Sequence, residues 1–139
     1  MHLSRYAVQQ MTPNQFIDQA LGTPFAFGEG SWTGCDCWGL VELWYRELRG
    51  IELSDRGDYG FGHEALQEWF DAGHGRWIEV DEPQDHDLVI MSVGQISAAH
   101  VGIFWDGSVL HTSNRIGCTF QPLTNKMIAS SATGFLTHQ

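Results

Sequence analysis

The chain has 139 residues, of which 42% are hydrophobic and 12% aromatic, which is enough apolar material for one packed domain without a disulfide framework. Its formal net charge of −10, with 7 basic residues against 17 acidic ones, excludes the basic surface of a nucleic-acid binder and argues against electrostatic adhesion to an anionic membrane. The sequence holds no run of about 18 apolar residues that would insert into a membrane, and residues 1–10 lack the apolar core of a signal peptide.

The first predicted element is a helix with signals at both ends. Thr12 can cap it, Pro13 suits the first helical position, and Gln15 can complete a capping box. Gly22 is a natural stop. These residues predict a helix over 13–21.

A loop and a second helix follow. Asp36 is placed to cap this helix, which runs to about Arg49 with apolar side chains at helical spacing and stops at Gly50. A short third helix is predicted over 63–72, where apolar residues again share one face. The glycines that mark the loop are Gly28, Gly30 and Gly34.

The second half of the chain has the pattern of short strands separated by turn residues. Asp106-Gly107 between two apolar runs is a strong signal for a β-hairpin, and Phe135-Leu136 are expected to close the sheet. Helices followed by strands predict an α+β fold with a five- to six-stranded antiparallel sheet. The other predicted strands are 77–80, 87–92, 100–105, 108–111 and 117–121.

An odd number of cysteines leaves at least one thiol unpaired, and Cys37 is the one best placed for chemistry. It lies in the first turn of the second predicted helix, where N–H groups and the helix dipole favour an anion and lower a thiol pKa. The same N–H groups can bind the oxyanion that forms when a thiolate attacks an amide. A disulfide between Cys35 and Cys37 is not expected, because the ring would be strained. The alternative is that Cys37 is a buried structural cysteine.

A thiol nucleophile needs a base and a group that orients the base. His100 and His111 each lie at the end of an apolar run, on the two strands that the 106–107 turn joins. Both fall near the open end of this hairpin, so one imidazole can take the thiol proton while the other fixes its tautomer. The alternative is two unrelated histidines at strand ends.

Three motifs in order give a family resemblance. Residues 34–41, Gly-Cys-Asp-Cys-Trp-Gly-Leu-Val, resemble the Asp-Cys-x-Gly-Leu-Val nucleophile motif of NlpC/P60 peptidases. Residues 99–104 are similar to the His-Val-Gly-Ile strand of that family, and 110–112 followed by Gly117 are similar to its third motif. The resemblance covers roughly residues 12–137.

The resemblance implies a papain-like NlpC/P60 fold with a triad of Cys37, His100 and His111, where His100 is the base and His111 its orienter. It implies a cysteine endopeptidase that hydrolyses peptidoglycan stem peptides between D-glutamate and the diamino acid. No metal and no cofactor are expected. Tryptophan after the nucleophile, at Trp38, is similar to the phage-tail (tail-tip protein) branch of the family.

The phage-tail resemblance implies other tail proteins as partners. Since no signal peptide is expected, the protein would be made in the cytoplasm, carried in a phage or phage-like tail, and brought by it to the periplasmic cell wall. The whole chain, 1–139, is expected to be a single peptidase domain in which 1–11 form an irregular extension.

The sequence departs from the family at the oxyanion site. Many members have tyrosine twelve residues before the nucleophile, and this chain has Phe25, which has no hydroxyl group to donate. Trp32 or backbone donors can compensate. Trp32 and Trp38 can line a substrate cleft, although large aromatic side chains more often belong to the core. Asp36 belongs to the nucleophile motif but already has a structural role as a helix cap.

Three alternatives remain open from the sequence. A zinc site could use Cys35, Cys37, Cys118 and His100, although the spacing is unusual for zinc. A non-catalytic structural tail component would keep the peptidase fold without the activity. A thiol acyltransferase acting on lipid or amide substrates is the third.

Overall fold

The computed structural model describes residues 11–53, 77–94 and 96–139. Within these ranges the two longer helices precede all the strands of the main sheet, as the sequence predicts. The helix predicted over 63–72 lies outside the described residues, as do residues 1–10 of the predicted extension.

The two predicted N-terminal helices are confirmed together with their end signals. Helix α2 spans Pro13–Leu21 and begins with a complete capping box, in which the Thr12 hydroxyl accepts from the backbone N–H of Gln15. Helix α3 spans Cys37–Arg49 and has Asp36 as its N-cap. It ends at Gly50, whose left-handed φ of 64° is readily adopted only by a residue without a side chain.

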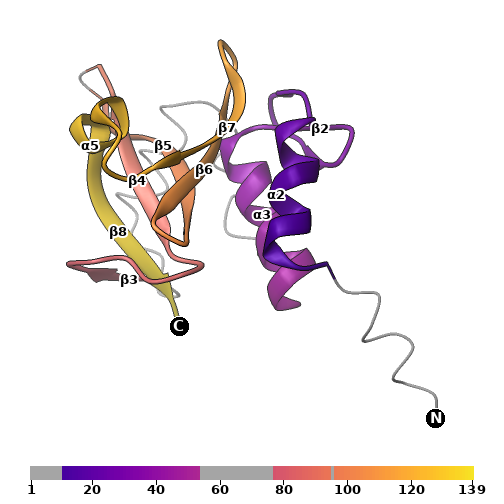
Figure 1. The fold of residues 1–139 in the computed structure, drawn as a ribbon, viewed down its shortest axis with the longest axis horizontal. Helices are drawn as coiled ribbons and strands as arrows, with labels where there is room; N and C mark the ends of the chain where they lie inside the picture. The colour runs from indigo at the N-terminus through magenta and orange to yellow at the C-terminus, as the bar shows by residue number, and fades with distance from the viewer. Residues whose placement is uncertain (1–10, 54–76, 95) are drawn as a thin grey trace.

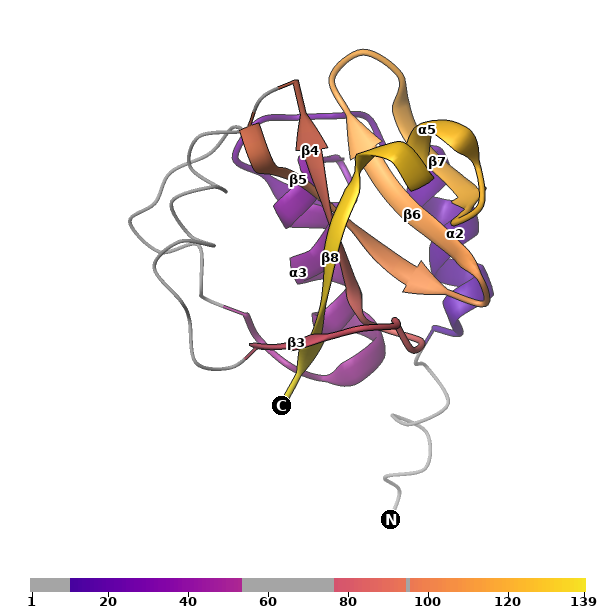
Figure 2. The same cartoon turned by 90° about the vertical axis from the view of Figure 1, so that its left-hand side faces the viewer.

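The main sheet has six strands in the order β3-β8-β4-β5-β6-β7, and every neighbouring pair is antiparallel. The C-terminal strand β8 therefore lies between β3 and β4 rather than at an edge (Figure 2). The predicted α+β class and antiparallel sheet are confirmed. The strands are β3 Trp77–Val80, β4 Leu88–Val93, β5 Ile96–Trp105, β6 Ser108–Ser113, β7 Gly117–Pro122 and β8 Ala132–His138.

Three short elements were not expected from the sequence. Strands β1 Gly30–Ser31 and β2 Gly34–Cys35 pair with each other in the loop before α3, and helix α5 Lys126–Ser131 precedes β8. The hairpin predicted at Asp106-Gly107 is confirmed, since both residues have positive φ and Trp105 pairs with Ser108.

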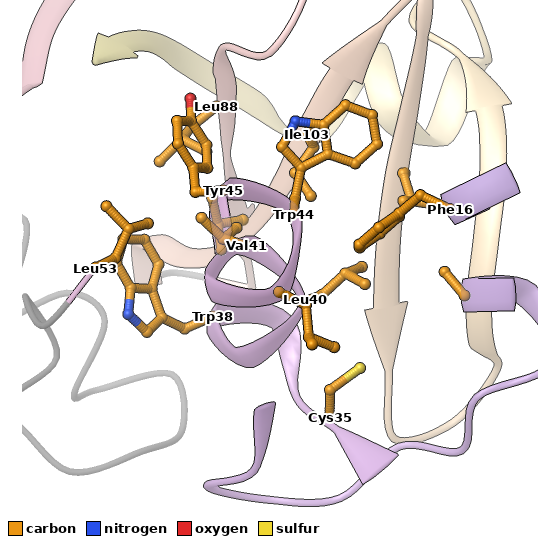
Figure 3. Packing of buried hydrophobic residues seen from close by; sticks show 14 of the residues in the cluster. Phe16, Cys35, Trp38, Leu40, Val41, Trp44, Tyr45, Leu53, Leu88 and Ile103 are labelled. Atoms are coloured by element: carbon orange, nitrogen blue, oxygen red, sulfur yellow. The ribbon is translucent and has the colours of Figure 1, made fainter. Parts of the chain in front are cut away.

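The sheet separates two hydrophobic clusters. Helices α2 and α3 lie side by side on one face, and α5 covers the other face (Figure 1). The larger cluster forms around α3, whose Trp44 ring is fully buried between α2 and the sheet (Figure 3). In the described part of the chain, no helix has the length and apolar character needed to span a bilayer.

Candidate active site

The loop before α3 is tied to the start of the helix by one buried carboxylate. Asp36 is 4% exposed, and its two oxygens accept from the backbone N–H groups of Gly28 and Gly39, each at 2.7 Å. The backbone N–H of Asp36 also donates to the carbonyl oxygen of Glu29 at 3.0 Å. These three bonds hold Cys37, the first residue of α3, against the loop.

Gly39 allows this loop to cross directly over the first turn of α3. A Cβ atom at Gly39 would lie 1.8 Å from the carbonyl oxygen of Glu29 and 2.9 Å from Cα of Gly30. Backbone atoms cannot yield as a flexible side chain can, so no larger residue fits here. The glycine of the nucleophile motif therefore has a packing role.

The three cysteines form no disulfide in the described part of the chain, and they differ in environment. Burial, followed by the nearby Asp36 carboxylate, raises the pKa of Cys35 to about 11. Burial also raises the pKa of Cys118 to about 12. Cys35 and Cys118 therefore stay protonated near neutral pH. Cys37, in contrast, is half-buried at the start of α3.

His100 and His111 lie together, as their places on the predicted hairpin imply. Nε2 of His100 lies 2.9 Å from Nδ1 of His111, and the two rings meet edge to face with centroids 5.1 Å apart. In the register of β5 and β6, Ile103 pairs with Leu110, and one residue further His111 stands opposite Gly102. His100 lies two residues before Gly102 on the same face of β5, so the two histidines are diagonal neighbours. A Cβ atom at Gly102 would lie 3.1 Å from Cβ of His111, so the missing side chain makes room for the pair.

The second nitrogen of His111 also has a partner. Its Nε2 lies 3.2 Å from Oγ1 of Thr119, which stands directly across from His111 in the β6–β7 ladder. Burial lowers the pKa of His111 below the usual histidine value, which favours the neutral ring. No local motif marks Thr119, although a β6–β7 register counted from the 114–116 turn sets it opposite His111.

Helix α3 packs against both histidine strands. It contacts β5 and β6 in the core, and Cys37 itself packs at the border of the larger hydrophobic cluster. The structure thus joins the two histidines directly and sets the helix that begins at Cys37 against the strands that carry them.

The aromatic residues singled out from the sequence have different surroundings. Phe25 forms an isolated bridge with Cys35, two residues before Cys37, and its ring meets that of Phe27 edge to face at 4.8 Å. Phe25 therefore lies beside the nucleophile loop, and Phe27 is 59% exposed there.

The two tryptophans belong to the core. Trp38 is only 4% exposed, and its ring lies beside Leu53 (Figure 3) and 6.4 Å from that of Trp77. Trp32 packs its ring 4.8 Å from that of Phe16 and borders the same cluster. Of the two surroundings that the sequence allows, core or substrate cleft, the structure places Trp38 in the core and sets Trp32 against the same core cluster.

The zinc alternative needs at least three ligand side chains that converge. Among the described residues, no such group of His, Cys, Asp and Glu exists. Cys35, Cys37, Cys118 and His100 are all described, and they do not form one.

Residues 22–137 match the NlpC/P60 family, which places the nucleophile loop, α3 and the histidine hairpin inside the matched region. The chain belongs to the NlpC/P60 family. The Asp-Cys-x-Gly motif of an NlpC/P60 domain is thus represented here by the Asp36 cap, Cys37 and the close approach at Gly39.

Known proteins similar to this NlpC/P60 chain include a phage protein. The chain is 35% identical over 124 residues to the tail tip assembly protein K of Escherichia phage N15, covering 78% of this chain and 48% of that protein. The chain therefore spans about half the length of this curated relative.

Solved NlpC/P60 structures share the fold at lower sequence identity. The NlpC/p60 domain of the peptidoglycan hydrolase SagA has a TM-score of 0.60 at 18% identity, covering 89% of this chain and 94% of that chain. The peptidoglycan hydrolase RipB from Mycobacterium tuberculosis has a TM-score of 0.57 at 20% identity, covering 96% of this chain and 65% of that chain.

We expect Asp36→Ala to destabilise this NlpC/P60 domain by about 2 kcal/mol, because two backbone N–H groups lose their acceptor. Urea unfolding followed by circular dichroism measures the change. Thr12→Ala, which removes the exposed cap of α2, is the matched control and should cost only about 1 kcal/mol. Equal midpoints for Asp36→Ala and the unmodified protein would contradict the role of Asp36 as the clamp of the loop.

Proposed function

We propose that this chain is a cysteine peptidase that hydrolyses peptidoglycan stem peptides as part of a phage or phage-like tail. The observation that carries the proposal is the hydrogen-bonded pair of His100 and His111, on strands packed against the helix that begins at Cys37. Two proteins of the same fold are named peptidoglycan hydrolases, and the phage relative is named for tail tip assembly. The proposed bond is that between D-glutamate and the diamino acid.

His100 is the proposed general base. Its Nε2 already meets His111, so the thiol proton of Cys37 goes to Nδ1 of His100. The ring then carries a hydrogen on both nitrogens, and Nε2–H donates to Nδ1 of His111. A thiolate and an imidazolium replace a neutral thiol and a neutral imidazole, with no net change of charge.

Acyl transfer then follows in two balanced steps. Sγ of Cys37 attacks the carbonyl carbon of the scissile amide, and the C–N bond breaks as His100 returns the proton to the leaving amine. Water next attacks the carbonyl carbon of the thioester and gives one proton to His100. The C–S bond then breaks, the carboxyl product leaves, and the Cys37 thiolate takes the proton back from His100. The base thus acts as acid and as base in turn.

The proposed oxyanion donor is the backbone N–H of Cys37 in the first turn of α3. The N–H of Gly39 is held by Asp36 and does not serve this purpose. Phe25 stands beside the nucleophile loop without a hydroxyl group, so the backbone must supply the stabilisation. The carboxylate cap does not touch the reacting atoms and instead keeps the helix start in place.

Digestion of purified peptidoglycan, with mass analysis of the released fragments, tests the function. We expect fragments that end at D-glutamate on one side and begin with the diamino acid on the other. Cys37→Ala, which leaves the helix cap intact, should release none. Fragments from another bond would overturn the bond assignment, and none from the unmodified protein would overturn the peptidase.

A second candidate is a structural tail component that keeps the fold without activity, and Phe25 is the observation that favours it. A tail assembled with Cys37→Ala separates the two. Normal assembly with failed penetration of the cell wall supports the peptidase acting in the periplasm, whereas unchanged infection supports the structural component.

Selective alkylation should identify the reactive thiol. At pH 7 we expect iodoacetamide to modify Cys37 almost alone, because burial raises the pKa of Cys35 and of Cys118 to about 11 and about 12. Peptide mapping by mass spectrometry locates the label. Preferential labelling of Cys35 or Cys118 would contradict the assignment of the nucleophile.

A further inference from the structure

The hydrogen-bond chain that starts at His100 does not end at His111. Oγ1 of Thr119 lies 3.2 Å from Nε2 of His111, and Nδ1 of His111 lies 2.9 Å from Nε2 of His100. We infer that Thr119 is a positioning residue whose hydroxyl holds His111 in the tautomer that lets His100 take up the thiol proton. This inference rests on the proposed function and adds to it a residue that does not touch the substrate.

The direction of the two hydrogen bonds follows from counting protons. Once His100 holds the thiol proton, both of its ring nitrogens carry hydrogen, so its Nε2 can only donate. Nδ1 of His111 must then accept, and the single hydrogen of a neutral His111 ring must lie on Nε2. Burial keeps this ring neutral by lowering its pKa. Nε2–H of His111 therefore donates to the hydroxyl oxygen of Thr119.

The opposite arrangement would block the reaction. If Thr119 donated to Nε2 of His111, then Nδ1–H of His111 would point at Nε2 of His100. Protonation of His100 would set two N–H groups against each other, which opposes formation of the thiolate. When the Thr119 hydroxyl accepts from Nε2–H of His111, it therefore stabilises the imidazolium of His100. His111 becomes a stronger donor at Nε2 because its Nδ1 accepts from the charged ring of His100.

The strand register explains why residue 119 has this role. His111 and Thr119 are direct cross-strand partners, so their side chains leave the sheet on the same face and within reach of each other. Valine has almost the same shape as threonine but lacks the hydroxyl group. With a methyl group there, Nε2–H of the half-buried His111 would lose its acceptor, which raises the free energy of the reactive tautomer.

Thr112 offers a matched control on β6. It is 0% exposed, and its hydroxyl has no hydrogen-bond partner within the described residues. Thr112→Val therefore removes a hydroxyl group from the same sheet and leaves the hydrogen bonds that link His100, His111 and Thr119 intact. Thr119→Ser keeps the hydroxyl group and serves as the rescue variant.

The experiment compares the full-length protein with Thr119→Val, Thr119→Ser and Thr112→Val. Long-range ¹⁵N–¹H NMR reports which nitrogen of His111 carries hydrogen, alkylation against pH reports the thiolate of Cys37, and fragment release reports turnover. We expect Thr119→Val to lose the Nε2–H signature and to lower both kcat and alkylation at pH 7 by about five- to tenfold. KM should not change, and Thr119→Ser and Thr112→Val should match the unmodified protein.

Two results would overturn the inference. One is a Thr119→Val protein with the tautomer, alkylation profile and kcat of Thr112→Val, and the other is a Thr119→Ser protein as impaired as Thr119→Val. Absence of fragment release from the unmodified protein would overturn the proposed function alone. The tautomer and alkylation measurements would still decide the role of Thr119, since neither needs a substrate.

Discussion

Replacing His100 by alanine should lower fragment turnover about as much as replacing Cys37, by roughly a thousandfold or more. Without the imidazole, the thiol stays largely protonated at neutral pH and the leaving amine has no acid. The double variant Cys37→Ala, His100→Ala should be little worse than either single one, because the residues act as a unit. Turnover of purified peptidoglycan fragments measures the series, with circular dichroism to confirm folding.

His111→Ala should retain measurable activity, with a loss of roughly 10- to 100-fold. The variant removes the hydrogen bond that His111 accepts from the charged ring of His100 but leaves His100, the base, in place. A neutral imidazole also stabilises an imidazolium less than a carboxylate would, so the loss of His111 costs less. His111→Asn and His111→Gln should retain more, since an amide oxygen can accept from Nε2–H of His100 as Nδ1 of His111 does.

The histidine series can fail in two informative ways. An inactive His111→Ala protein beside an active His100→Ala protein would reverse the two roles. Full activity in both would remove the basis for a cysteine peptidase. Neither outcome would alter the geometry of the pair, which the β5–β6 register determines.

Gly39→Ala should destabilise the fold by at least about 4 kcal/mol, a loss that only a severe clash produces. The added Cβ atom would lie 1.8 Å from the carbonyl oxygen of Glu29, so either the loop must leave α3 or the first helical turn must unwind. Both movements would break the bonds from Asp36 to Gly28 and Gly39. Urea unfolding measures the stability, and iodoacetamide reports whether Cys37 keeps its reactivity.

Gly22→Ala is the matched control for this prediction. At Gly22 the nearest atom to a new Cβ lies 3.8 Å away and φ is −96°, so alanine fits and the stability should change by less than about 0.5 kcal/mol. Equal unfolding midpoints for the two variants would show that the loop can move aside without cost.

Local signals in the sequence determined the elements and much of the candidate site. The capping box at Thr12, the Asp36 cap and the Asp106-Gly107 turn each depend on residues a few positions apart, and the structure confirms all three. The hairpin turn also brought His100 and His111 together, because a two-residue turn leaves little freedom in how its strands pair. The role of Cys37 as nucleophile stays a prediction.

The short elements were missed for a physical reason. Strands β1 and β2 have two residues each, and α5 has six, so their residues carry too little periodicity to reveal them. They form because the surrounding chain holds them, as Asp36 does for the loop that contains β1 and β2. The burial of Trp38 against Trp77 likewise depends on residues far apart in the sequence.

Only the tertiary structure decided the order of the strands and the outer partner of the histidines. Strand β8 lies between β3 and β4, where its Leu136 is buried in the larger cluster, and no local signal states with which strands this last strand will pair. The Oγ1 atom of Thr119 reaches His111 through cross-strand register. Turns and helix caps depend on residues that are neighbours in the sequence, so a local pattern predicts them. Strand order and register depend on how the whole sheet buries its apolar side chains, and a local pattern carries no information about that burial.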